Sequence, residues 1–380
     1  MEKTLHEKNG LSWYQWEEDG ICKIQLTGKG VLSDHEADKF AAEFLDSSHY
    51  EILVSEDCDV YGPRESTVFD MFSEQEETKE WDLLISFRKG VIPSELCGEA
   101  RLGLRGAARM SKNRGTAAGK IDLEKLDRDA DQVVIQGTRL RYYSKDGIIS
   151  DTVEANPVRS GIAGFFGKTV RNPYCRQTAY TKDNFALFSK SFPFIQAVSN
   201  HFKEVAPVRW GNQKKYVEEK GIREGGWVVP DTVFTSITVN KDFQTAVHKD
   251  AGDLHEGFGN LTVLEGGNDT YKGGYTCLPK FRVAVDVRTG DFLGMDVHNW
   301  HGNIQIESAE EGKDDWERIS VVCYCRADVA KCGTQLEEKE KYETWLAQRR
   351  NPKEQHTFRV GKHLEEKQKD ADFMGEFGVD

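Results

Sequence analysis

Three side chains in the second half of the chain are of types that bind a transition metal. His248 and Asp250 lie two residues apart in H-K-D, so on a strand both would point to the same face. A histidine from a distant strand, such as His301 in W-H-G-N, would complete a set of two imidazoles and one carboxylate. That set holds Fe(II) and leaves positions open for a cosubstrate and O2. H-x-D alone also fits a surface histidine beside a solvated aspartate, so the metal hypothesis depends on the segments that follow.

Those segments contain the turns and strands that are needed to place the ligands. Gly273-Gly274, followed by Leu278-Pro279, is typical of a tight turn that enters a strand. Gly290-Asp291 is a second turn signal, and it leads into an apolar run that ends at His301. We therefore expect His301 on a strand that is separate from the H-x-D segment.

A second constellation opens the strand predicted at 319–324. Arg318 and Ser320 are two residues apart in R-I-S, so they share one face of that strand. A guanidinium fork and a hydroxyl on one face can hold a carboxylate. The alternative is a plain surface arginine. A cupin-type barrel that only binds a metal would have no need of this pair.

This ordered set (H-x-D, G-G, G-D, W-H-G-N, R-x-S) resembles the Fe(II)/2-oxoglutarate-dependent dioxygenases. Among them it is most similar to the TET/JBP group, the oxidases of 5-methylpyrimidines in DNA, including their viral relatives. The resemblance depends on T-V-N before the H-x-D segment, on H-K-D-A-G-D and D-V-H-N-W-H-G-N, and on the separation of His301 from Arg318. It extends over about residues 155–326, is weaker over 100–120 and is absent elsewhere.

The resemblance implies a fold, two cofactors and a reaction. The fold is a double-stranded β-helix, a jelly roll of two sheets with helices against one of them. His248, Asp250 and His301 would bind Fe(II), and 2-oxoglutarate would be the cosubstrate, with its C5 carboxylate on Arg318 and Ser320. With O2, such an enzyme hydroxylates an unactivated C–H, here the methyl group of 5-methylcytosine or thymine in DNA.

Two further histidines lie close to this set. His298 competes with His301 for the third ligand position, and on a strand the two would face opposite sides. We prefer His301 because it follows Trp300 before the strand and because W-H-G is the motif at the ligand position of the family. His255 lies in a glycine-rich loop, and we expect it at the entrance of the site.

A basic segment at 101–120 stands out in an acidic chain. It carries six positive charges without an intervening acid, at Arg101, Arg105, Arg109, Lys112, Arg114 and Lys120. Interleaved glycines indicate that it is at least partly loop. It would bind DNA phosphates, with Arg105, Arg109 and Arg114 as the contacts. The alternatives are a solvated face or a charge partner for the acidic segments at 74–80 and 307–317. Asn240 in T-V-N is a candidate contact to the base, and Phe243 and Gln244 are weaker candidates.

The sequence of the N-terminal region predicts an α/β unit that supports the core and carries no candidate catalytic residues. Residues 11–30 predict a hairpin that turns at Asp19-Gly20. Ser33 and Glu36 form a capping box before a helix. Its apolar stripe comprises Ala37, Phe40, Ala41, Phe44 and Leu45. A strand at 51–54 and a helix through Trp81, Leu84 and Phe87 complete the predicted elements of this region.

The remaining elements surround the predicted core. Strands are expected at 133–135 and 140–143. The glycines at 158–167 suit a loop at the mouth of the site, and packed glycine turns under a helix would explain them equally well. A helical region at 182–203, broken at Pro193, would pack outside the barrel. A charged helix at 335–350 would bury a stripe formed by Leu336, Tyr342, Trp345 and Leu346.

The fold class is therefore mixed α/β with a double-stranded β-helix core. We divide the chain into three parts. Residues 1–154 form the N-terminal α/β support region with basic loop 101–120, 155–332 the dioxygenase core, and 333–380 a charged helical tail. The length of 380 residues suits one large enzyme domain or two smaller ones.

Composition and charge limit the binding partners and the cellular location that we expect for this protein. A net charge of −13 argues against nonspecific coating of nucleic acid but allows a local basic face for DNA. No run of 18 apolar residues and no secretory signal are found, so we expect no membrane contact and a location in the cytoplasm, or in the nucleus of a eukaryote. We expect a monomer. The eight cysteines lack a framework spacing, which favours free thiols.

Three functions remain open at this stage. The first is a DNA 5-methylpyrimidine dioxygenase. The second is a 2-oxoglutarate dioxygenase for protein side chains or small molecules, which would leave the basic segment without a role in substrate binding. The third is a non-catalytic, cupin-like binding module. The sequence distinguishes neither cytosine from thymine nor single-stranded from double-stranded DNA, and it does not give the extent of oxidation.

Overall fold

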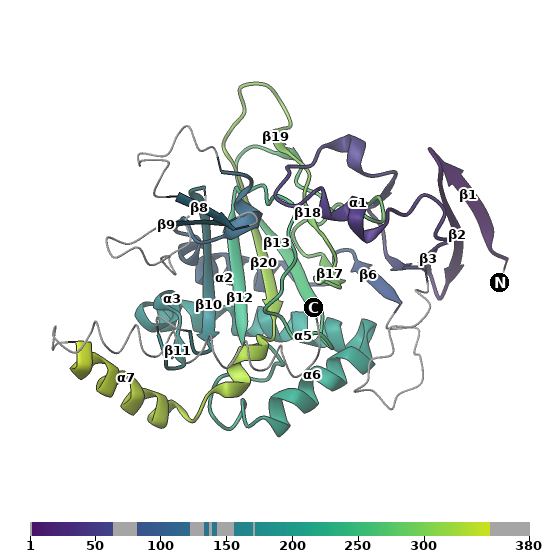
Figure 1. The fold of residues 1–380 in the computed structure, drawn as a ribbon. Helices are drawn as coiled ribbons and strands as arrows, with labels where there is room; N and C mark the ends of the chain where they lie inside the picture. The colour runs from purple at the N-terminus through teal and green to yellow at the C-terminus, as the bar shows by residue number, and fades with distance from the viewer. Residues whose placement is uncertain are drawn as a thin grey trace, which may run out of the picture.

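Two β-sheets packed face to face form the centre of the molecule. The computed structural model describes residues 2–63, 82–121, 133–136, 139–142, 156–169 and 172–349. In the larger sheet, the central order is β17-β13-β20-β12-β10, with antiparallel neighbours throughout (Figure 1). These strands span Phe292–Met295, Gly259–Gly267, Trp316–Tyr324, Ser236–Lys241 and Val158–Phe166.

The smaller sheet has the order β18-β15-β16-β4. Its strands span Gly302–Asn303, Thr276–Leu278, Val283–Val285 and Ile52–Val54. A two-stranded ribbon, β14 (Tyr271–Gly273) with β19 (Ile306–Ser308), lies alongside. One apolar cluster joins the sheets and includes Leu261, Val263, Leu278, Val283, Val285 and Leu293. This two-sheet, jelly-roll-like arrangement confirms the predicted mixed α/β fold class.

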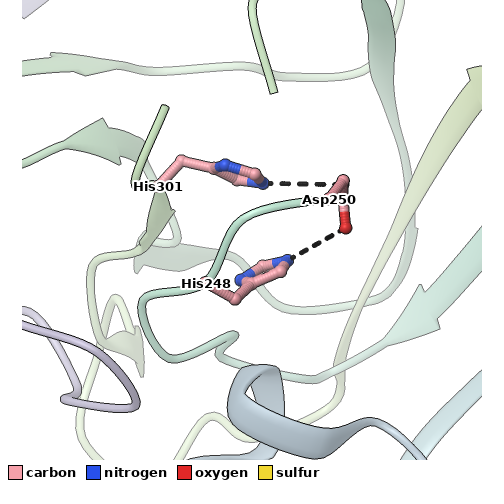
Figure 2. A group of neighbouring side chains, drawn as sticks. All are labelled: His248, Asp250 and His301. Carbon is pink, nitrogen blue, oxygen red and sulfur yellow. Dashed lines mark ion pairs between the residues drawn. The ribbon is translucent and has the colours of Figure 1, made fainter. Parts of the chain in front are cut away.

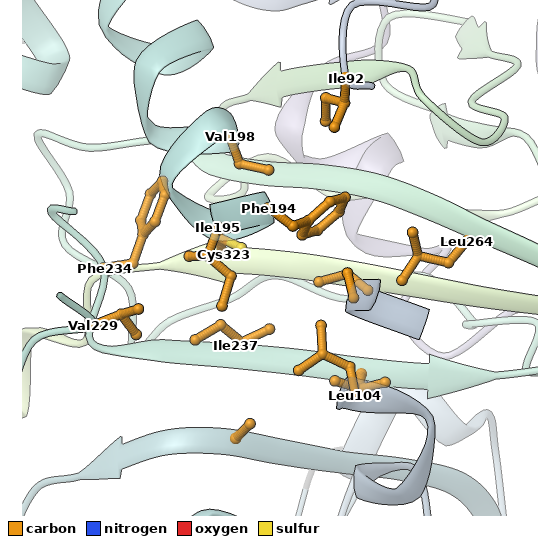
Figure 3. Close-up of a cluster of buried hydrophobic side chains, with 14 of the residues drawn as sticks. Ile92, Leu104, Phe194, Ile195, Val198, Val229, Phe234, Ile237, Leu264 and Cys323 are labelled. Carbon is orange, nitrogen blue, oxygen red and sulfur yellow. The ribbon is translucent and has the colours of Figure 1, made fainter. Parts of the chain in front are cut away.

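Helices cover the outer face of the larger sheet. α5 (Phe192–Val205) buries a stripe at helical spacing, formed by Phe194, Ile195, Val198 and Phe202. Figure 3 shows Phe194, Ile195 and Val198 of this stripe against Ile237, Leu264 and Cys323 of the strands. The period of two along β20 buries Ile319, Val321 and Cys323 under the helices. The same period therefore turns Arg318 and Ser320 toward the space between the sheets.

Several other elements surround this core. The helices are α2 (Ser94–Leu104), α3 (Ala179–Asp183), α4 (Phe185–Phe188) and α6 (Pro207–Glu219). The short elements are η1 (Ser47–His49), η2 (Arg105–Ala107), β7 (Met110–Ser111), η3 (Gly115–Ala118), β11 (Arg176–Gln177), η6 (Ser189–Ser191) and η7 (Ala327–Lys331). β8 (Val133–Gln136) and β9 (Arg139–Tyr142) pair as an antiparallel hairpin, which confirms the strands predicted there. None of the helices in the described part of the chain has the length and apolarity to span a bilayer.

The N-terminal strands extend the larger sheet beyond β17. They are β1 (Thr4–Lys8), β2 (Leu11–Glu18), β3 (Ile21–Leu26), β5 (Cys58–Tyr61) and β6 (Leu83–Arg88), on the right in Figure 1. The predicted hairpin is confirmed, and its turn has the positive φ angles of Asp19 (55°) and Gly20 (76°) that two-residue hairpins require. β3 and β5 are parallel, unlike the other pairs in this extension.

The helix predicted through Leu84 and Phe87 is wrong. Both residues lie on β6, which pairs with β5 and β17. Every residue from Leu83 to Phe87 is buried, so the run is apolar on both faces and its periodicity does not separate a strand from a helix. Trp81 lies outside the described residues.

The helix after Ser33 is shorter than predicted. Its capping box is present, since the Ser33 hydroxyl accepts from the Glu36 N–H and the Glu36 carboxylate accepts from the Ser33 N–H. α1 nevertheless ends at Asp38. Ala42 has φ of +63°, which ends helical geometry, and its N–H donates to the Val247 carbonyl at 2.8 Å. A tertiary contact therefore takes the place of the last predicted turns.

The loop predicted at 158–167 is also wrong, because these residues form β10 between β12 and β11. Their glycines serve close packing. A Cβ at Gly161 would lie 1.9 Å from the Ala107 carbonyl oxygen, so the strand could not pass η2 with any larger residue. Gly164 has φ of +94°, a conformation that favours glycine.

The predicted C-terminal helix is confirmed as α7 (Gln335–Arg349). Its apolar stripe is only partly correct, because Leu336 is 67% exposed, whereas the rings of Tyr342 and Trp345 lie 5.0 and 5.3 Å from the ring of Tyr174. The chain also contains a disulfide between Cys175 and Cys332. The expectation of free thiols is therefore wrong for this pair, which is 157 residues apart and has no spacing signal.

Candidate active site

A single β-bridge brings the two candidate histidine ligands face to face. The N–H of His248 donates to the carbonyl of His301 at 2.9 Å, and the reverse bond is 3.0 Å long. His248 lies in an irregular segment after β12, and His301 immediately precedes β18. The bridge therefore joins the H-x-D segment to the edge of the smaller sheet. It does so although His248 lies on no regular strand, whereas the sequence pattern predicts a strand for the H-x-D pair.

His248, Asp250 and His301 converge, and their candidate ligand atoms all lie within 4.8 Å of one another (Figure 2). The Nε2 atoms of His248 and His301 each lie 3.7 Å from a different oxygen of Asp250. The Asp250 side chain is 37% exposed, so one side of the group is open. Two imidazoles and a carboxylate with an open side match the donor set that Fe(II) takes in 2-His-1-carboxylate sites.

The backbone orients both imidazoles. Nδ1 of His248 lies 2.8 Å from the Ala246 carbonyl, and Nδ1 of His301 lies 2.9 Å from the Asn299 carbonyl. A carbonyl only accepts, so each Nδ1 carries the proton and each Nε2 presents its lone pair to the site. Burial, aided by His248 nearby, lowers the pKa of His301 to about 4. The neutral ring is the form that binds a metal.

His298 lies outside this group. Its Nδ1 is 3.2 Å from Oδ1 of Asp296, and this hydrogen bond raises the pKa of His298 above its ordinary value. The ring of His255 packs against His298 at a centroid distance of 4.8 Å. Of the two competing histidines, the structure therefore brings His301 and not His298 to Asp250.

Arg318 is a buried cation without a counter-ion. Its side chain is 2% exposed, and Nη2 donates to the Gly274 carbonyl at 2.9 Å. Nε has no hydrogen-bond partner, and among the described residues no carboxylate forms an ion pair with this guanidinium. A buried charge that lacks a partner costs several kcal/mol. The residues present therefore fit an anionic ligand, such as a carboxylate, at Arg318.

The glycine turn at 273–274 makes room for this guanidinium. Gly274 has φ of +71°, and a Cβ there would lie 2.9 Å from Nε of Arg318. Ser320 and Asn240 face each other in the register of β20 and β12, and Asn240 Oδ1 accepts from Ser160 on β10. Arg318, Ser320, Asn240 and Ser160 thus share the interior side of the larger sheet.

Residues of the basic segment have separate environments. Arg101 and Arg105 each donate to Glu317 at 2.7 Å, and Lys241 contacts the same carboxylate. Glu317 is 5% exposed, and these cations hold its pKa below the usual range despite its burial. The pairing predicted with the acidic segment 307–317 is confirmed for Arg101 and Arg105.

The other two predicted phosphate contacts differ from Arg105 and from each other. Arg114 turns inward, where its Nη2 donates to the Gly161 carbonyl at 2.9 Å and its Nε has no partner. Burial lowers the pKa of Arg114 below its ordinary value, although the charges of Tyr324 and Asp250 act in the opposite direction. Arg109 and Lys112 are exposed, and neither makes an ion pair with the described residues. The two weaker candidates serve the fold, because Phe243 is buried and Gln244 donates to the Leu45 and Asn303 carbonyls.

Ser160 and Glu317 were missed in the sequence. Ser160 would have been found if 158–166 had been predicted as a strand, because alternation then places it beside Asn240. No sequence motif indicates a role for Glu317. Its partners come from two distant segments, Arg101 and Arg105 from one and Lys241 from the other, so only the folded chain shows the cluster.

Comparison with known proteins identifies the segment that holds the candidate ligands. Residues 162–327 match the model of the Tet_JBP family, the oxygenase domain of the 2OGFeDO superfamily. This segment is similar to a Tet_JBP oxygenase domain. His248, Asp250, His301 and Arg318 all lie inside it, whereas the basic segment at 101–120 precedes it. The superfamily is the one that uses iron and 2-oxoglutarate.

The chain is also similar to curated proteins and to solved structures. The chain is 38% identical over 177 residues to "Thymine dioxygenase JBP1-B" of Trypanosoma cruzi, which covers 44% of this chain and 19% of that protein. It is 29% identical over 199 residues to "Bifunctional helicase and thymine dioxygenase JBP2" of Leishmania infantum. This match covers 52% of this chain and 17% of that protein. The chain thus spans less than a fifth of these relatives. NgTET1 in complex with 5mC DNA shows 13% identity over 75% of this chain and 84% of that one, with a TM-score of 0.40.

Proposed function

We propose that this protein is an Fe(II)- and 2-oxoglutarate-dependent dioxygenase that hydroxylates the 5-methyl group of a pyrimidine in DNA. The observation that carries the proposal is the convergence of His248, Asp250 and His301 in the same Tet_JBP-like segment as Arg318, a buried cation without a counter-ion. The first group fits the metal and the second fits the cosubstrate. Few proteins that only bind a metal would bury an unpaired arginine in the same domain.

The three ligands would hold the iron on one side. The Nε2 lone pairs of His248 and His301 and a carboxylate oxygen of Asp250 are available together, because both Nδ1 atoms are held by backbone carbonyls. When bound, the iron and its cosubstrate supply the oxidising power for C–H hydroxylation, and 2-oxoglutarate leaves as succinate and CO2. The chain's own part is to fix the ligand atoms and to keep the histidines neutral.

Arg318 and Ser320 would hold the distal carboxylate of 2-oxoglutarate. Nε of Arg318 has no partner among the described residues, so it can donate to a carboxylate oxygen, and the Ser320 hydroxyl projects from the same face. Gly274 leaves the space that a side chain would fill. Arg114, also with an unpaired Nε, would serve the same pocket rather than a phosphate.

DNA is the proposed substrate class. The two curated relatives are named as thymine dioxygenases, and the solved structure is named as a complex with 5mC DNA. A methyl group inside a duplex is out of reach of a buried metal, so the nucleotide would be extruded into the pocket. Arg109 and Lys112 are exposed and make no ion pair with the described residues, so they are the proposed phosphate contacts of the basic segment. Asn240 is the proposed contact to the base.

Mass spectrometry of nucleosides tests this proposal. The protein is incubated with Fe(II), 2-oxoglutarate and duplexes that contain thymine or 5-methylcytosine. The digest is then examined for a base that has gained one oxygen atom. Production of the hydroxymethyl base from either duplex, and its loss on chelation of the metal, would support the proposal. Absence of any oxidised base from both duplexes would contradict it.

A second candidate function is a 2-oxoglutarate dioxygenase for a protein side chain or a small molecule. One observation favours it, because Arg101 and Arg105 are occupied by Glu317 and so are less available for DNA. This candidate requires the same metal and cosubstrate. It predicts no stimulation of succinate formation by DNA, whereas the first function predicts stimulation.

A further inference from the structure

Two free cysteines face each other where the N-terminal strands join the rest of the larger sheet. Cys22 on β3 and Cys58 on β5 are directly paired positions of two parallel strands. Their side chains lie on one face, since Cys58 belongs to the apolar cluster between the sheets and Cys22 packs against that cluster. Neighbouring strands are about 4.8 Å apart, which lies within the range of roughly 4.4–6.8 Å between the Cα atoms of a disulfide.

The two thiols differ in access. Cys58 is 3% exposed, whereas Cys22 is partly exposed and lines a cleft of about 790 Å³. The cleft is largely polar, and its other walls include His6, Gln15, Glu17, Asp57 and Lys89. A small polar reagent can therefore reach Cys22 from solvent, but it reaches Cys58 only past Cys22.

The two thiols also differ in acidity. Contact with the Cys58 thiol lowers the pKa of Cys22 to about 7, although burial and the charges of Asp59 and Glu17 act in the opposite direction. The same contact, together with burial, raises the pKa of Cys58 well above its ordinary value. At neutral pH a substantial fraction of Cys22 is therefore thiolate while Cys58 stays a thiol, which is the arrangement of an attacking and a resolving cysteine.

We propose that Cys22 and Cys58 form a peroxide-sensitive dithiol, in which Cys22 attacks the oxidant and Cys58 then closes a disulfide. The Cys22 thiolate would attack one oxygen of hydrogen peroxide, the O–O bond breaks, and hydroxide leaves and takes up a proton. Cys58 sulfur then attacks the sulfenic acid, loses its proton and releases water. Two thiols and one peroxide thus give one disulfide and two waters. The sulfurs are oxidised and the peroxide is reduced.

The other free cysteines lack this combination of features. Cys97, Cys277, Cys323 and Cys325 are buried, and burial raises the pKa of each thiol. None of them is the strand partner of another cysteine in the described sheets. They provide internal controls within the same molecule. The inference does not depend on the dioxygenase function, because Cys22 and Cys58 lie outside the segment that matches the Tet_JBP family.

The test uses the full chain, reduced under native conditions and freed of reductant. It is exposed at pH 7 to a few equivalents of hydrogen peroxide, alkylated, digested without reduction and mapped by mass spectrometry. We expect a linked pair of peptides that contain Cys22 and Cys58, while Cys97 and Cys277 remain alkylatable after unfolding. Before oxidation, Cys22 should react with a maleimide about tenfold faster than an unperturbed thiol, since a larger fraction of it is thiolate at pH 7.

Serine variants separate the two roles. In Cys58→Ser, Cys22 should accumulate as a sulfenic acid that dimedone traps, because no resolving thiol remains. In Cys22→Ser, Cys58 should stay reduced at the same peroxide concentration. If the wild-type chain gives no peptides linked through Cys22 and Cys58, or if Cys58 oxidises equally well in Cys22→Ser, the proposal is wrong. The wild-type experiment alone decides if either variant fails to fold.

Discussion

The imidazoles of the candidate metal site are oriented by their own local backbone. In both histidines, Nδ1 bonds to the carbonyl of the residue two positions earlier, Ala246 for His248 and Asn299 for His301. The orientation therefore needs no carboxylate from elsewhere in the chain. The ligand atoms are arranged before any metal binds, and we expect loss of one ligand to remove metal binding without loss of the fold.

Substitution of each ligand tests this account of the site. His248→Ala, Asp250→Ala and His301→Ala should each abolish Fe(II)-dependent 2-oxoglutarate turnover, with circular dichroism like that of the wild type. His298→Ala is the matched control, because His298 bonds to Asp296 and lies outside the group. Metal content after dialysis and succinate formation are the two measurements. An active His301→Ala enzyme together with an inactive His298→Ala enzyme would show that the third ligand is wrongly assigned.

Arg318 should control affinity for the cosubstrate. Hydrogen bonds to charged groups contribute about 1.5–3 kcal/mol each, so Arg318→Ala should raise the apparent KM for 2-oxoglutarate about ten- to a hundred-fold or more. Arg318→Lys should rescue only part of this loss, because an ammonium group does not reproduce the fork. Steady-state kinetics with varied 2-oxoglutarate measure the effect. An unchanged KM in Arg318→Ala would exclude this residue as the carboxylate contact.

At the residue scale, the two-residue spacing of the motifs predicted which side chains share a face. It did not predict the environment of each arginine in the basic segment. H-x-D and R-x-S carry their geometry in two-residue spacing, which is local information. Arg105, Arg109 and Arg114 look alike in sequence, yet one pairs with Glu317, one is exposed and one points inward. These differences depend on contacts with residues far along the chain.

Among the elements, β20 connects the most features. Its outer face packs under the helices, its inner face carries Arg318 and Ser320, and Glu317 near its start is held by Arg101, Arg105 and Lys241. The Glu317 cluster therefore fixes α2 and η2 to the strand that presents Arg318. Arg101 and Arg105 of the basic segment therefore contribute to stability through this cluster.

Separate variants distinguish the structural cations from the proposed DNA contacts. Arg105→Ala should lower the melting temperature by about 2–4 °C for a loss of about 1 kcal/mol, with the salt dependence of DNA binding unchanged. Arg109→Ala with Lys112→Ala should leave stability unchanged. The double variant should flatten the slope of log K against log salt by nearly one unit per lost phosphate contact. If the double variant keeps the wild-type slope, this segment does not contact DNA.

Acid stability should depend on the buried network at β5. Asp59 accepts from Lys23, Ser86 and Arg88, which together hold the pKa of Asp59 below its ordinary value in spite of burial. Because the folded-state pKa is below the unfolded value of about 3.9, the carboxylate stabilises the fold above that pH. This stabilisation is lost as the pH falls through the folded-state pKa.

Asp59→Asn should therefore destabilise the protein at pH 7 by about 3–5 kcal/mol, since Lys23 and Arg88 lose their buried counter-ion. Its stability should change less than that of the wild type below about pH 4. Urea unfolding at several pH values measures both effects. Glu56→Gln, which removes an exposed ion pair with Lys89, is the control and should change little. Parallel acid profiles for Asp59→Asn and wild type would contradict this assignment.

Elements with one buried face were predicted better than elements with two. The β2–β3 hairpin and α7 have polar outer faces, so their periodicity was readable. β6 and β10 are buried on both sides or crowded by a neighbour, and there the apolar run or the glycines suggested a helix or a loop. The disulfide between Cys175 and Cys332 joins distant segments and left no local signal.

At the scale of the whole molecule, the two-sheet core was predicted from the order of the motifs along the chain. That order indicated a family resemblance, and the local strand and helix propensities contributed less. The sequence did not predict that the N-terminal strands would continue the larger sheet. That continuation depends on the pairing of β6 with β17 across a long sequence separation. The division at residue 154 stays a prediction.

The most direct test of the central claim is whether turnover depends on the methyl group. Succinate is measured with two duplexes of the same sequence, one with thymine and one with uracil, and the comparison is repeated with 5-methylcytosine and cytosine. We predict that at least one methylated duplex gives more succinate than its unmethylated partner, with one hydroxymethyl base formed per excess succinate. Equal succinate from both members of each pair, with no oxidised base, would contradict the assignment of DNA methyl groups as the substrate.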